Sequence, residues 1–128
     1  MRVAAAQYGI IRGMEEIDFA SDTFDDIVAK DSRYDARAYA LLMDVVRRRE
    51  DGGDFDLLDE FRETALDQYG PLAYTVLTEW GVVCTEDVGE MMFNLAEARR
   101  VKRREEDSSE SFAGGYDFKE AFLGPYEV

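Results

Sequence analysis

The chain has 128 residues and a mass of 14.6 kDa, which is the usual size of one domain. Its formal net charge of −14 repels a bare phosphate backbone or an anionic membrane unless the charge is segregated along the chain. There is no histidine and only one cysteine, which excludes Ser-His-Asp and Cys-His nucleophile pairs, zinc sites of the Cys/His kind, His-ligated haem and an intramolecular disulfide. With 46% hydrophobic residues, the composition is nevertheless that of a folded chain.

The first thirteen residues carry two bases, Arg2 and Arg12, and no apolar run long enough for a membrane helix or a secretory signal. We expect residues 1–13 to be an N-terminal arm or the product of an upstream start codon, followed by a single domain over residues 14–128. A lone Cys84 fits a reducing compartment, where thiols need no partner. The expected location is therefore the cytoplasm, without membrane contact.

Apolar residues recur at helical spacing through most of the chain. Residues that suit a helix N-terminus precede these stretches, such as Pro71 in a first turn and Thr85 as a cap, and Gly70 and Gly81 follow two of them. Helices are thus expected near residues 22–30 and 36–49, from a cap at Asp54 or Asp56 to Gly70, from Pro71 to Gly81, and from Thr85 to about Arg100.

The pattern changes after Arg100. Residues 101–105 and 116–118 alternate as strands do, and a polar loop that ends in two glycines separates them. A helix, a tight turn, a second helix and a hairpin follow one another in a winged helix. The predicted fold is therefore mainly α with a small C-terminal β-hairpin, a winged-helix-like helix-turn-helix plus wing preceded by two or three helices.

Short motifs of specific composition are spread over most of the chain. They are Asp31-Ser32-Arg33-Tyr34 with Ala38-Tyr39, Tyr69-Gly70-Pro71-Leu72-Ala73, Trp80-Gly81, Thr85-Glu86-Asp87-Val88-Gly89-Glu90, Phe93-Asn94-Leu95, Glu106-Asp107, and Tyr116-Asp117-Phe118 with Ala121-Phe122. In these motifs the chain resembles the Minf-type family of uncharacterised bacterial proteins, from about Met14 to Phe122. The resemblance implies a single small bacterial domain with a winged-helix-like body, and no established activity or ligand. The chain departs from the family at Arg99-Arg100, where a glycine-containing turn is expected, and ahead of Met14.

The helix that begins at Thr85 is expected to present an acidic outer face. Such hydrogen-bond acceptors repel phosphates, which a duplex-binding protein has to neutralise with Lys or Arg. Phe93 lies beside the apolar stripe of this helix, and an exposed aromatic residue among acids suits a protein interface. We therefore expect a non-catalytic protein-interaction module that meets a basic protein or forms a homodimer. Its expected contact residues are Glu86, Asp87, Glu90, Phe93, Asn94 and Glu97.

A second hypothesis is a winged-helix nucleic-acid-binding regulator. Its contacts would come from the basic block that follows the helix, namely Arg99, Arg100, Lys102, Arg103 and Arg104. The alternative role of this block is structural, because arginines at a helix C-terminus complement the helix dipole and pair with nearby glutamates. The acidity also has two explanations: attraction of a basic partner, or general solubility, including at high salt.

Catalysis is not expected. Cys84 is the sole plausible nucleophile, but Glu86 and Asp87 beside it should raise its pKa and there is no histidine to act as a base. The acids around the paired glycines 52 and 53 lack the spacing and the closing glutamate of a calcium loop. We therefore expect no catalytic residue, no cofactor and no metal.

Overall fold

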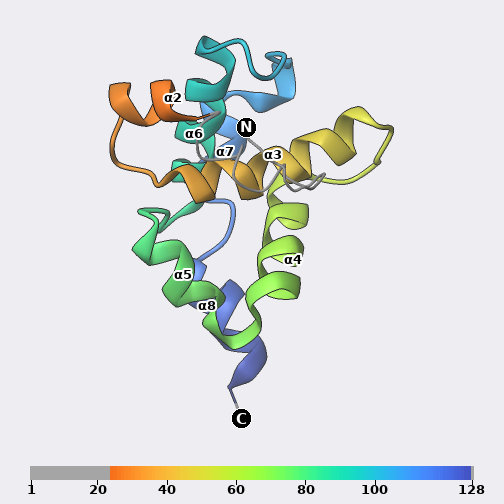
Figure 1. Cartoon of the computed structure of the whole chain (residues 1–128). Helices are drawn as coiled ribbons and strands as arrows, with labels where there is room; N and C mark the ends of the chain where they lie inside the picture. Colours follow the sequence, from red (N-terminus) through yellow and green to blue (C-terminus); the bar gives the residue numbers. More distant parts are fainter. Residues whose placement is uncertain (1–23, 128) are drawn as a thin grey trace, which may run out of the picture.

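The computed structural model describes residues 24–127, and in this part of the chain all regular secondary structure is helical (Figure 1). The expected arm over residues 1–13 and the first part of the expected domain, to residue 23, lie outside the described residues. None of the described helices combines the length and the apolar character that crossing a membrane requires. The α-helices are α2 (Asp25–Lys30), α3 (Ala36–Glu50), α4 (Leu57–Tyr69), α5 (Ala73–Glu79), α6 (Thr85–Glu97), α7 (Ser109–Phe112) and α8 (Phe118–Leu123), with 3₁₀ turns η1 (Gly70–Leu72), η2 (Glu105–Asp107) and η3 (Gly124–Tyr126).

Helix α3 crosses the middle of the molecule and separates two groups of elements (Figure 1). Below it in this view, α4 packs against α3, α5 and α8. Above it, α6 packs against α7. The largest fully buried side chains of the shared core include Tyr39 and Leu42 of α3, Phe61 of α4, Met91 of α6 and Phe122 of α8.

The predicted helix boundaries in the middle of the chain are confirmed. The Asp35 carboxylate accepts a 2.8 Å hydrogen bond from the backbone N–H of Arg37 and caps α3. Asp56, rather than Asp54, caps α4, and Gly70 ends it with a φ of 54°. Gly81 follows α5 with a φ of 92°, and a Cβ at this position would lie 2.0 Å from the backbone oxygen of Arg33, so only glycine fits.

The predicted winged-helix-like fold with a C-terminal β-hairpin is wrong. No strand occurs in residues 24–127, and the two segments expected as strands are irregular chain and the start of α8. The reason is local capping. The carboxylate of Asp117 accepts from the backbone N–H of Glu120, and Ser108 similarly caps α7. Phe118, Ala121 and Phe122 then lie on one buried helical face, a spacing of three and four that a strand does not use.

The expected helix-turn-helix pair is also not formed. Helix α5 packs against α4 and α8, whereas α6 packs against α7, so the two helices belong to different parts of the fold. Within residues 24–127, the predicted acidic helix therefore has neither the supporting helix nor the wing of a DNA-reading domain.

Thr85 does not cap α6 as predicted but lies within its first turn, 1% exposed. Its hydroxyl donates a 2.6 Å hydrogen bond to the backbone oxygen of Phe112 and accepts a 3.0 Å hydrogen bond from the backbone N–H of Gly115. Phe112 itself packs against Gly89 so closely that a Cβ there would lie 2.9 Å from it. These contacts attach the chain after α7 to the start of α6, in the region where a hairpin was predicted.

Replacing this buried hydroxyl by a methyl group tests the arrangement. Thr85→Val keeps the side-chain shape but leaves a backbone oxygen and a backbone N–H without their partner. We expect a loss of about 1 to 3 kcal/mol in the free energy of unfolding, measured by denaturant titration. Thr85→Ser, which keeps the hydroxyl, is the matched control and should retain more stability than Thr85→Val. Equal stability of Thr85→Val and the wild type would contradict the assigned hydrogen bonds.

Candidate functional site

Two grooves lie on either side of the chain that follows α6. The first, here the Phe93 groove, has a volume of about 740 Å³ and lies between α6, the chain after it, and α7. The second, here the cationic groove, has a volume of about 670 Å³ and lies between α3, the end of α6 and Phe24. Ala96, Val101 and Lys102 line both, so one stretch of chain forms the common wall.

The Phe93 groove brings together residues from both sets predicted from the sequence. Glu86, Glu90 and Phe93 line it from α6, and Lys102, Arg103 and Arg104 line it from the following chain. Phe93 is 51% exposed, as its position beside the apolar stripe predicts. The guanidinium of Arg103 lies over its ring, 5.3 Å from the ring centre. The result is a partly covered aromatic surface with charges of both signs around it.

The exposed acids of α6 have partners within the fold. Glu86 accepts a 3.0 Å hydrogen bond from the backbone N–H of Gly114, which lowers the pKa of its carboxyl. Glu90 lies 3.2 Å from a guanidinium nitrogen of Arg33, and Glu97 lies 3.4 Å from one of Arg103. All three carboxylates remain accessible and available to a partner, and the exposed ion pairs of Glu90 and Glu97 are weak.

Asp87 and Asn94, two other predicted contact residues, instead hold the loop after α2 against α6. Asp87 accepts hydrogen bonds from the Tyr34 hydroxyl at 2.5 Å and from the backbone N–H of Val83 at 2.9 Å. Asn94 donates to the Asp31 carboxylate at 2.9 Å and to the Tyr39 hydroxyl at 3.0 Å. Their polar atoms are occupied inside the fold and contribute little to an outer surface. The spacing along the helix does not reveal this, because Tyr34, Asp31 and Tyr39 are more than 50 residues away in sequence.

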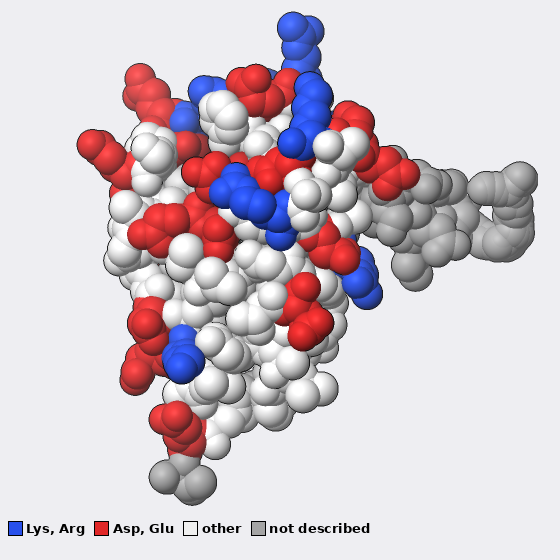
Figure 2. All heavy atoms as spheres, turned by 90° about the vertical axis from the view of Figure 1, so that its left-hand side faces the viewer, with Lys and Arg blue, Asp and Glu red and all other residues white. Residues whose placement is uncertain are grey.

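The predicted nucleic-acid contacts do not form one free basic surface. Arg100 pairs with Asp26 at 2.8 Å, Arg103 pairs with Glu97, and Arg104 pairs with Glu50 at 3.0 Å. Figure 2 shows the consequence on one face of the molecule, where Lys and Arg alternate with Asp and Glu. Within residues 24–127, Arg99 and Lys102 form no ion pair, and both line the cationic groove.

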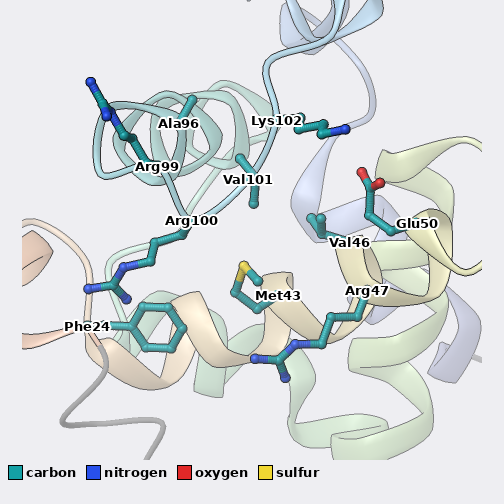
Figure 3. Close-up of a pocket in the computed structure, with 10 residues that line it drawn as sticks. All are labelled: Phe24, Met43, Val46, Arg47, Glu50, Ala96, Arg99, Arg100, Val101 and Lys102. Atoms are coloured by element: carbon teal, nitrogen blue, oxygen red, sulfur yellow. The ribbon is translucent and has the colours of Figure 1, made fainter.

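The cationic groove joins the two basic clusters of the sequence, of which the first is Arg47-Arg48-Arg49 and the second is the block from Arg99 to Arg104 (Figure 3). Arg47 comes from the first cluster, on α3, and the other cations come from the second. Arg47 and Arg100 lie on either side of Phe24 and Met43, while Lys102 faces Glu50 at the far end (Figure 3). The described residues that line the groove form an apolar floor and a basic rim with one acid, Glu50. The floor consists of Phe24, Met43, Val46, Ala96 and Val101, and the bases are Arg47, Arg99, Arg100 and Lys102.

A buried ion pair holds both grooves in shape. The guanidinium of Arg49 makes hydrogen bonds of 3.0 and 2.9 Å with the two carboxylate oxygens of Asp107, and both side chains are less than a tenth exposed. These bonds raise the pKa of Arg49, which stays charged. The pair fastens η2 to the end of α3. Sequence analysis missed it, because the two residues are 58 positions apart and each lies in a run of like charges.

Removing one partner of this ion pair should destabilise the fold. Asp107→Ala leaves the buried Arg49 guanidinium without its counter-charge, and we expect a loss of about 3 to 5 kcal/mol in unfolding free energy. The double variant Arg49→Met/Asp107→Leu removes both charges and should recover most of the loss. Denaturant titration of the three proteins measures this difference. If Asp107→Ala were as stable as the wild type, the pair would not be buried in solution.

Arg99 follows the C-cap of α6 and adopts a backbone conformation that favours glycine. Its φ is 61°, and the turn is closed by hydrogen bonds from the N–H of Arg99 to Ala96 and from the N–H of Arg100 to Leu95. This is the Schellman turn, whose left-handed position is usually glycine. The sequence resemblance also implies a glycine-containing turn here. An arginine therefore stands on the rim of the cationic groove in spite of local strain.

Removing that strain should stabilise the protein. Arg99→Gly is expected to raise the unfolding free energy by about 1 kcal/mol, because glycine adopts the left-handed conformation without a Cβ penalty. Arg99→Ala is the control, since it removes the charge but keeps the Cβ, and it should give no such gain. Thermal and denaturant unfolding of both variants distinguish strain from charge. A destabilised Arg99→Gly would contradict the assigned turn.

The thiol of Cys84 precedes α6 and lies 3.4 Å from a carboxylate oxygen of Asp87. Burial raises the pKa of the Cys84 thiol, with Asp87 adding to the effect, so the thiol stays protonated and is a poor nucleophile. Within residues 24–127, no three acidic or cysteine side chains come together in a way that would hold a metal ion.

Comparison with family models, curated proteins and solved structures finds no match to this chain. The resemblance to the Minf-type family therefore remains a prediction.

Proposed function

We propose that this chain is a non-catalytic protein-interaction module that binds a basic protein, or a second copy of itself, through the Phe93 groove. The observation that carries the proposal is Phe93 itself, a large aromatic side chain that is half exposed in a groove of about 740 Å³. Aromatic residues are enriched at protein interfaces, where they supply much of the binding energy. Exposed carboxylates of Glu86, Glu90 and Glu105 around the groove favour a partner with basic side chains.

The nucleic-acid alternative has one observation in its favour, the meeting of Arg47 with the second basic cluster. Against it stand the net charge of −14 and the ion pairs that occupy Arg100, Arg103 and Arg104. A duplex binder needs several bases free to neutralise phosphates. The protein interaction is therefore the function that the geometry supports best.

The experiment compares two variants that each remove one exposed apolar side chain. Phe93→Ser alters the groove, and Val83→Ser is the matched control, because Val83 is 53% exposed and does not line the groove. We expect Phe93→Ser to weaken association at least tenfold, the loss of about 1.4 kcal/mol typical of a hot spot, and Val83→Ser to leave it unchanged. Both should unfold within about 0.5 kcal/mol of the wild type.

Two measurements read this out. Sedimentation velocity over a concentration series detects self-association, and immobilised wild-type and variant proteins are compared for the basic proteins that they retain from nuclease-treated extract of the source cells. A partner retained equally by Phe93→Ser and wild type would refute the groove as the contact. A monomeric wild type that retains no protein but binds labelled duplex DNA below micromolar concentration would favour the alternative instead.

A further inference from the structure

The cationic groove has the chemistry of a site for an acidic, partly apolar segment of protein. Its floor contains Met43, Val46 and Val101, and its rim carries four cations against one acid (Figure 3). Apolar side chains from a ligand would be removed from water on this floor while carboxylates meet the rim. This groove is distinct from the Phe93 groove, so the inference goes beyond the proposed function and does not rest on it.

The rim has unused hydrogen-bonding capacity. Nη1 of Arg100 is buried and has no acceptor among residues 24–127, although its Nη2 pairs with Asp26. A buried donor without a partner is costly, so an acceptor is expected at this point. Arg47, Arg99 and Lys102 are exposed and form no ion pair with another described residue. Arg99 holds its place on the rim in a strained conformation.

The sequence that leads into this groove has the complementary composition. Phe24 lines the groove, and the ten residues before it, 14–23, contain four acids and no base. Ile17 and Phe19 lie among these acids. Phe19 is five positions before Phe24 and therefore lies within about 18 Å of it along even a fully extended chain. Attachment this short gives the segment an effective concentration in the millimolar range at the groove.

We propose that residues 15–19, Glu-Glu-Ile-Asp-Phe, bind in the cationic groove of the same chain. The carboxylates of Glu15, Glu16 and Asp18 neutralise the rim and supply the acceptor for Arg100. Ile17 and Phe19 cover the apolar floor. The segment thereby occupies the groove in which Arg47 meets the second basic cluster.

Zero-length cross-linking of the full chain tests this contact directly. A carbodiimide joins a lysine amine to a carboxylate only when the two touch, and the chain has just three lysines, Lys30, Lys102 and Lys119. Lys102 lines the groove, whereas Lys119 lies on α8 in the other part of the fold and serves as the reference (Figure 1). We expect mass spectrometry to find Lys102 joined to Glu15, Glu16 or Asp18 in the monomer, at least fivefold above any link from Lys119 to these acids. The yield should fall as salt is raised.

Variants that retain Lys102 and the three carboxylates distinguish specific binding from chance encounter. Arg47→Glu/Arg99→Glu changes the rim but leaves Lys102 and the acids, and we expect the Lys102 cross-link to fall at least fivefold. Phe19→Ser removes only an apolar contact and should lower it at least threefold. Glu63→Gln is the matched control, because Glu63 is exposed on α4 away from the groove, and it should change nothing. Circular dichroism confirms that each variant is folded.

Three results would overturn the proposal. The first is a Lys102 cross-link to residues 15–19 no stronger than that of Lys119. The second is a cross-link that appears only between copies when isotopically labelled and unlabelled chains are mixed, which would make a second copy the occupant. The third is an unchanged cross-link in both Arg47→Glu/Arg99→Glu and Phe19→Ser. The Phe93 groove is tested separately by Phe93→Ser.

Discussion

The surface of this protein depends on the buried ion pair between Arg49 and Asp107. Both side chains are almost fully enclosed, and their two hydrogen bonds fasten η2 to the end of α3. The chain between α6 and η2 is thereby held over α3, so that the Phe93 groove lies on one side of it and the cationic groove on the other. A buried pair of this kind contributes less to net stability than to the choice of one arrangement, because desolvation offsets much of the attraction.

Most arginines within residues 24–127 form an ion pair, whereas more than half of the acids there pair with no described base. Arginines of the second basic cluster pair with acids from α2, α3 and α6, which brings distant parts of the chain together. This pairing explains how a chain of net charge −14 carries a basic cluster without a broad cationic face. Two accessible surfaces follow from this arrangement. The Phe93 groove presents an aromatic side chain among charges of both signs, and the cationic groove presents a basic rim over an apolar floor. These two surfaces call for partners of different chemistry.

The sequence predicts some elements well and others badly, for reasons visible in single residues. Asp35, Asp56 and Gly70 act through bonds within a few positions, so the boundaries of α3 and α4 are readable from the chain. The hairpin fails because three alternating residues at 116–118 are too few to define a period, whereas Asp117 followed by Glu120 is a helix-start signal. Thr85 resembles a cap by type and position, but its hydroxyl bonds to chain about thirty residues away.

Local order and the broad electrostatic character were therefore determined by the sequence alone: several helices, an acidic chain and an exposed Phe93. The tertiary structure decided which polar side chains face outward. Asp87 bonds to Tyr34, and Asn94 bonds to Asp31 and Tyr39, whereas Glu86 and Glu90 stay at the surface. It also decided that Arg47 meets the second basic cluster. The physical reason is the sequence separation over which each kind of interaction acts. Caps and periodicity act over one or two helical turns, whereas ion pairs and grooves join residues 50 or more positions apart, whose approach depends on how the whole core packs.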